Sequence, residues 1–143
     1  MEINGLPLHP LVVHAAVVLG PLAALAALGY LVPRWREPVR WPMVMLAAVA
    51  TGAIVLAYYS GGDLLDSRPE LRGSPQVLDH EELGDQLLWV GLAFGAVALI
   101  AGLVHARRGV LRVLFDVLLG LAAVVLVVWV FRTGEAGARA VWG

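Results

Sequence analysis

Four long stretches of this chain are almost free of charge, and they limit what the chain can fold into. Three of them, residues 10–33, 41–60 and 86–106, carry no formal charge, and residues 113–131 are apolar except for Asp116. Each matches the roughly 20 residues that a helix needs to cross a bilayer core of about 30 Å. Since backbone groups in lipid must be paired within the segment, we expect four membrane-spanning helices, at about 10–33, 41–60, 86–106 and 111–131.

The composition supports a membrane protein over a soluble domain. Hydrophobic residues make up 60% of the 143 residues, charged residues make up 15%, and the mean hydropathy is +0.83. A soluble domain is about 45–50% apolar and about a quarter charged. The prediction is one all-α domain, an integral membrane four-helix bundle in contact with the lipid bilayer. The absence of cysteine excludes disulfides and thiolate metal sites, and a net charge of −1 gives no reason to expect a nucleic-acid partner.

Charge in the segments between the stretches indicates their orientation. Residues 34–40 and 107–112 hold six of the ten arginines, whereas residues 61–85 hold seven acidic residues. Short connections rich in arginine face the cytoplasm. We therefore expect both termini and an acidic loop at 61–85 outside, with the chain forming two out–in–out hairpins. The first stretch lacks a basic segment before it, so we expect it to be a retained span and not a cleaved signal peptide.

Several motifs resemble those of one family. Residues 5–14, GLPLHPLVVH, are similar to the LHPxxVH opening of small bacterial membrane proteins grouped as domain of unknown function 2231. Residues 60–65, the H-x-x-L-G pattern in 78–84, and the Thr-Gly segment at 133–138 continue the resemblance over nearly the whole chain. Glu135 stands where the family often has His or Asp, and Ala15 and Ala16 replace its usual aromatic and proline residues. The resemblance implies a four-helix protein of the bacterial inner membrane with no assigned activity.

Three histidines are predicted to lie at the outer membrane face. His9 and His14 are five residues apart, roughly 140° around a helix, so they cannot both face one ligand unless the start of the helix unwinds. His14 and His80, on different helices, form the more plausible pair. Two histidines on facing helices can hold haem iron or a divalent metal. The alternative is that no cofactor is bound and that His14 only hydrogen-bonds Asp63 or Glu135 to order the helix ends.

A mixed metal site is the second possibility for these residues. Imidazole and carboxylate ligands from His14, His80, Asp63 and Glu135 would suit a divalent ion. The leading prediction is that a b-type haem or a metal at this cluster, with His9 nearby, serves redox chemistry or electron transfer. The sequence contains no catalytic signature such as GxSxG or a Walker loop, and whether the protein is an enzyme stays open.

An ionisable cluster is also expected at the inner face. Asp116 lies about one turn inside the fourth stretch, and Arg112, four residues earlier, shares its helix face. Because an unpaired carboxylate at that depth is expensive, we predict a structural ion pair between Arg112 and Asp116, with His105 as a further member.

Small residues and a weak repeat complete the pattern. Gly91, Gly95 and Gly102 form a stripe on the third helix, which predicts close helix contact. That contact could be internal, with a second copy, or with a larger membrane complex of which the chain is a non-catalytic accessory subunit. Each half of the chain also begins with an outward histidine and reaches an arginine-rich turn, which either a duplication or two unrelated hairpins would produce.

Overall fold

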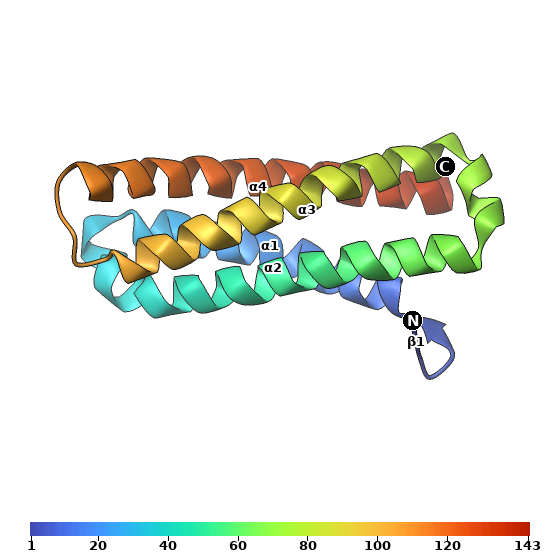
Figure 1. Ribbon diagram of the computed structural model, residues 1–143, viewed down its shortest axis with the longest axis horizontal. Coiled ribbons are helices and arrows are strands. Elements are labelled where there is room, and N and C mark those ends of the chain that lie inside the picture. The colour runs from blue at the N-terminus through green and yellow to red at the C-terminus, as the bar shows by residue number, and fades with distance from the viewer.

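Four long helices run side by side along the length of the molecule (Figure 1). The computed structural model describes residues 1–143 and confirms the all-α four-helix fold class. The helices are α1 (Leu8–Tyr30), α2 (Arg36–Ser67), α3 (Pro75–Leu103) and α4 (Val110–Trp142). Short 3-10 turns, η1 (Pro33–Trp35) and η2 (Pro69–Gly73), lie before and after α2, and strands β1 (Glu2–Ile3) and β2 (Leu6–Pro7) form an antiparallel hairpin before α1.

The helices form a ring of neighbours. α1 packs against α2 and α4, and α3 packs against α4 and α2, so α1 and α3 are diagonal to each other. Both termini and η2 lie at one end of the bundle, which we call the terminal end (Figure 1). Residues 31–40 and 104–112 lie at the other end, which we call the arginine end.

Proline and glycine set several of the helix boundaries. Pro75 is the first residue of α3, where its missing N–H needs no partner, and Pro33 follows closely after α1. Gly109 has a φ of 81° immediately before α4, a backbone conformation that glycine adopts without strain. The turn between β1 and β2 is Asn4–Gly5, with φ values of 52° and 78°, as in the tight hairpin turns that favour this dipeptide.

The helices extend beyond the uncharged stretches. The acidic segment expected as a 61–85 loop is mostly helical, because α2 continues to Ser67 and α3 begins at Pro75. Hydropathy marks the part of a helix that can lie in hydrocarbon, whereas acidic residues outside it are compatible with helix. The acidic segment is thus a rigid extension of the bundle at the terminal end.

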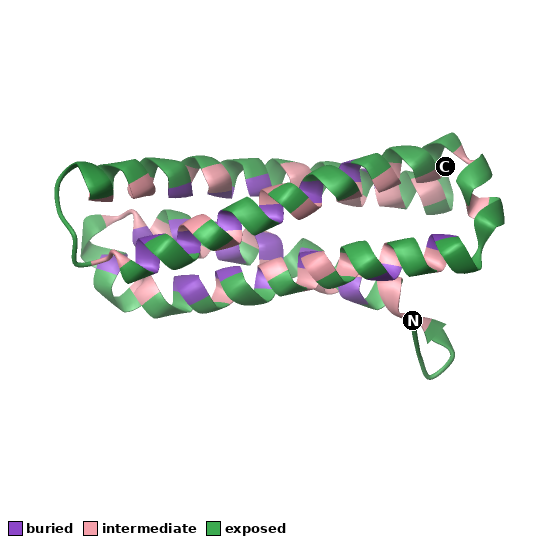
Figure 2. Ribbon diagram, viewed as in Figure 1, coloured by how far each residue is buried: buried purple, intermediate pink, exposed green.

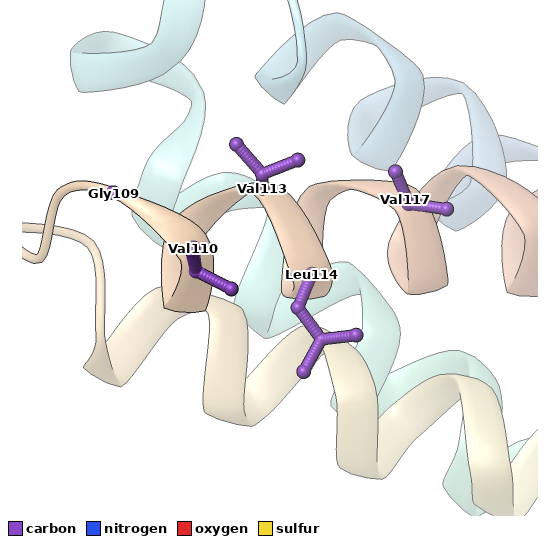
Figure 3. Close-up of a pocket in the computed structure, with 5 residues that line it drawn as sticks. All are labelled: Gly109, Val110, Val113, Leu114 and Val117. Atoms are coloured by element: carbon purple, nitrogen blue, oxygen red, sulfur yellow. The ribbon is translucent and has the colours of Figure 1, made fainter.

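The core is built from small side chains, and the outside is apolar. Ala23, Ala24, Ala27, Ala50 and Ala98 are fully buried, which lets the helices approach closely. Many large apolar residues are exposed on the helices, and Figure 2 shows how exposed and buried positions are distributed along them. A shallow hollow at the start of α4 is lined by apolar side chains and a glycine (Figure 3). All four helices are long and apolar enough to span a membrane. The chain is a multi-pass membrane protein whose outer surface contacts lipid.

Candidate functional site

His9 lies in the first turn of α1, at the terminal end. α1 begins at Leu8, with Pro7 at the N-cap, so the ring of His9 projects towards α2. Its Nδ1 is 3.0 Å from the carbonyl oxygen of Ala57 and 3.3 Å from Oγ of Ser60. A Cβ built on Gly61 would come within 3.0 Å of the ring, so glycine at 61 provides the space that the imidazole occupies.

His80 has the same surroundings in the other half of the chain. It lies near the start of α3, and its Nδ1 is 3.0 Å from the carbonyl oxygen of Thr133 on α4. A Cβ on Gly137 would approach its ring to 2.9 Å. Each histidine therefore bonds one carbonyl of the partner helix and packs on the glycine four residues further along.

The two imidazoles meet across the bundle. The ring centroids of His9 and His80 are 6.1 Å apart, and the ring planes are inclined by 65°. Because a carbonyl oxygen only accepts, each Nδ1 carries the proton, and each Nε2 keeps a lone pair with no protein partner. Neither Nε2 atom is fully buried, because Arg36 Nε is the one fully buried side-chain nitrogen or oxygen without a hydrogen bond.

The structure does not bring the other expected ligands to this pair. His14 is exposed, and its Nδ1 lies 2.5 Å from the carbonyl oxygen of Pro10 in its own helix, so His9 and not His14 faces His80. The pairing expected for His14 fails because helix phase turns it away. Asp63 binds the N-terminal amine, and Glu135 binds Arg139 at 2.5 Å. No three His, Asp or Glu side chains converge as a metal site, so the expected mixed set does not assemble.

At the arginine end, Asp116 is held mainly by a residue that the sequence analysis did not single out. Arg36 at the start of α2 donates two hydrogen bonds, of 2.8 and 3.1 Å, to the carboxylate of Asp116. Its guanidinium also lies 4.3 Å from the ring centre of Tyr30. Arg112 Nε is further away, 3.6 Å from Asp116. The i,i+4 spacing identified Arg112, whereas Arg36 comes from α2, which lies diagonal to α4 in the bundle, so only the folded arrangement reveals it.

His105 belongs to a neighbouring set of contacts and not to the Asp116 pair. Its Nδ1 is 2.9 Å from the hydroxyl of Tyr30, and its Nε2 is 2.5 Å from a carboxylate oxygen of Glu37. The Tyr30 hydroxyl also lies 3.3 Å from the carbonyl oxygen of Ala101. These bonds tie the end of α1 to α2 and α3, which is a fastening role. The expected contact of His105 with Asp116 is not formed, and His105 bonds Tyr30 and Glu37 instead.

The glycine stripe of α3 packs against α2 of the same chain. Gly91 faces Ile54, Gly95 faces Thr51 and Gly102 faces Val44, all on α2. Thr51 also donates a hydrogen bond of 3.1 Å to the carbonyl oxygen of Gly91. Since α2 occupies this surface, the expectation that the three glycines bind a second copy or another protein is not supported.

Comparison with known proteins agrees with this architecture. The family described as "Predicted membrane protein (DUF2231)" matches residues 5–143. A comparison with curated proteins and with solved structures finds no match. The match covers the bundle from the turn before α1 to the last residue, including both histidines of the pair. The chain therefore belongs to the DUF2231 family of membrane proteins.

Proposed function

We propose that this protein binds one b-type haem through His9 and His80 and serves electron transfer at the membrane. The observation that carries the proposal is the pair of facing imidazoles, each fixed by a bond from its Nδ1 to a backbone carbonyl. Histidines that ligate a metal donate the other ring N–H to a carbonyl or carboxylate, which sets the tautomer and the ring orientation. Both rings already have that arrangement in the structure.

The donor set favours haem over a bare divalent ion. Only two protein nitrogens are offered, and no third His, Asp or Glu side chain joins them. A porphyrin contributes four nitrogens of its own, so two imidazoles complete its iron. The two rings also lie close to each other, with their centroids 6.1 Å apart, so His9 and His80 would be the residues that hold the group.

The residues around the pair have separable tasks. The carbonyls of Ala57 and Thr133 hold the two Nδ1 protons, so both Nε2 atoms stay unprotonated in the neutral rings. Gly61 and Gly137 keep the helix surface beside each ring free of side chains. A bound haem would supply a one-electron carrier. With the terminal end outside the membrane, that carrier would exchange electrons with a partner at the outer face.

The absorption spectrum of the purified chain, expressed with haem supplied, tests this function. We expect a Soret band that shifts on dithionite reduction, and its loss in His9→Ala and in His80→Ala. His14→Ala is the matched variant, since it removes an imidazole five residues from His9 that faces away from His80, and it should keep the band. A colourless preparation would contradict haem binding, and metal bound instead would indicate a metal site. A band lost only in His14→Ala would contradict the ligand assignment.

A further inference from the structure

The two hairpins, α1–α2 and α3–α4, bury matching positions. Six of the seven buried residues of α1 have a buried counterpart 71 positions later in α3. The six in α1 are Val12, Ala16, Gly20, Ala23, Ala27 and Tyr30. In the same way, five of the six buried residues of α4 lie 76 positions after a buried residue of α2. Two amphipathic helices match in this way whenever they are aligned in phase, so the register needs independent support.

Contacts between the hairpins fix the same register. A Cβ on Gly20 of α1 would lie 3.0 Å from Val130 of α4, and a Cβ on Gly91 of α3 would lie 3.0 Å from Ile54 of α2. Gly91 is 71 positions after Gly20, and Val130 is 76 positions after Ile54. The two contacts are therefore equivalent: Gly20 with Val130 corresponds to Gly91 with Ile54. Such an exchange of partners is what a two-fold axis between the hairpins requires.

The histidine pair obeys the same two offsets. His80 is 71 positions after His9, while Thr133 and Gly137 are 76 positions after Ala57 and Gly61. Both bonds from Nδ1 to a carbonyl are 3.0 Å long. The two rings are thus equivalent residues that face each other from diagonal helices, with the axis passing between them.

One further contact shows how the halves have diverged. Gly102 of α3 faces Val44 of α2, while Gly120 of α4 faces Leu31 at the end of α1. These four residues occupy equivalent positions, with glycine and the larger side chain exchanged. The close approach is kept in both halves, although a different helix supplies the glycine.

We infer that the chain is two copies of one helical hairpin related by a two-fold axis along the bundle, and that the His9–His80 pair is a binding site on this axis. Parallel repeats of this kind have an axis along the membrane normal. The site then takes one nitrogen ligand from each copy. Its ligand is a group with two equivalent positions on opposite sides, as haem iron has; this last step rests on the proposed function.

The arginine end allows a test that does not involve the histidines. Arg36 and Arg112 are equivalent by the 76-residue offset, and both contact the carboxylate of Asp116. The residue equivalent to Asp116 is Arg40, which donates to the carbonyl oxygen of Gly102. If the axis is real, exchanging the residues at positions 40 and 116 gives the same contacts rotated by the two-fold axis. A carboxylate at position 40 then lies between Arg36 and Arg112, as the carboxylate of Asp116 does in the native chain.

The experiment compares melting temperatures of the full chain in detergent. Asp116→Arg alone places arginine at all four equivalent positions, 36, 40, 112 and 116, and should lower the Tm strongly. The exchange Arg40→Asp/Asp116→Arg should recover most of that loss. Arg34→Asp/Asp116→Arg is the matched control, because it has the same net charge but places the carboxylate on an exposed residue of η1. An exchange variant that melts no higher than this control would overturn the repeat.

A second measurement addresses the position of the site on the axis. In a haem titration of the full chain, His9→Ala and His80→Ala should weaken the affinity for haem by the same factor. Unequal losses would overturn the equivalent roles of the two rings while leaving haem binding in place. A native chain that binds no haem would contradict the proposed function, and the charge exchange would still decide whether the two hairpins are related.

Discussion

At the scale of single residues, sequence reasoning finds groups that need a partner more easily than it finds the partner. Asp116 was expected to be paired because an isolated carboxylate is expensive at its depth. The residue that grips it, Arg36, is 80 positions earlier in the chain. An i,i+4 neighbour can be read from spacing, but a contact between the diagonal helices α2 and α4 depends on how the whole bundle packs.

Arg36 is therefore expected to contribute more to stability than Arg112. The side chain of Arg36 is 9% exposed and makes two bonds to Asp116, whereas that of Arg112 is 36% exposed and lies 3.6 Å away. Removing one partner of a buried pair costs about 3–5 kcal/mol, and removing an exposed partner costs about 0–1 kcal/mol. Thermal unfolding in detergent should show a large loss for Arg36→Met and a small one for Arg112→Met.

The double variant Arg36→Met/Asp116→Leu provides the control for this comparison. It removes both charges, so it should be more stable than Arg36→Met alone, in which the carboxylate loses its main partner. Equal melting of Arg36→Met and Arg112→Met would show that the i,i+4 pair matters as much as the cross-bundle pair.

The histidines illustrate the same limit. Their residue type and their placement at one end of the bundle can be derived from sequence, and His80 was identified as a member of the pair. Choosing between His9 and His14 depends on where α1 starts and which way its first turn faces. The chain begins α1 at Leu8 and directs His9 towards Ala57 of α2. The glycines that accommodate the rings, Gly61 and Gly137, lie in two of the family-like segments, but their contact with the histidines cannot be derived until the partner helix is known.

At the scale of the helices, the apolar stretches predict how many there are but not how far they extend. The uncharged runs mark only the apolar part of each helix, while α2 and α3 continue into the acidic segment. The glycine stripe was correctly expected to allow close helix contact, yet spacing alone could not say whether the neighbour is internal. In the structure the neighbour is α2, which meets Gly91, Gly95 and Gly102 with Ile54, Thr51 and Val44.

Gly102 is expected to tolerate no larger side chain. Any Cβ at this position would collide with Val44, so Gly102→Val forces α2 and α3 apart. Overpacking of this kind costs about 1–3 kcal/mol. The Tm in detergent should fall for Gly102→Val and rise again when Val44→Ala is added. Gly52→Val is the matched control, because nothing lies within 4 Å of a Cβ there and its Tm should fall much less than that of Gly102→Val. A Gly102→Val chain as stable as Gly52→Val would show that the helices do not meet at this point.

At the scale of the whole molecule, hydropathy and charge carry most of what the sequence can predict. The four-helix membrane fold follows from the apolar runs and is confirmed. The structure adds that the charges are divided between the two ends. The arginine end holds six arginines with Glu37 and Asp116, and every other acidic residue lies towards the terminal end. A bundle divided in this way has one strongly preferred orientation under the rule that basic connections stay in the cytoplasm.

We accordingly predict that the arginine end is cytoplasmic and that both termini lie outside. Reporter fusions test this directly: alkaline phosphatase joined after Gly143 should be active, and a fluorescent protein joined after Arg108, in the connection between α3 and α4, should be fluorescent. Changing Arg107, Arg108 and Arg112 to Gln removes half of the basic residues at the arginine end, so the fraction of correctly oriented chains should fall. Changing Arg68, Arg72 and Arg139 to Gln is the matched control and should leave the orientation intact. A fluorescent fusion after Gly143 would reverse the orientation and place the His9–His80 pair at the cytoplasmic face, where its electron partner would then have to be sought.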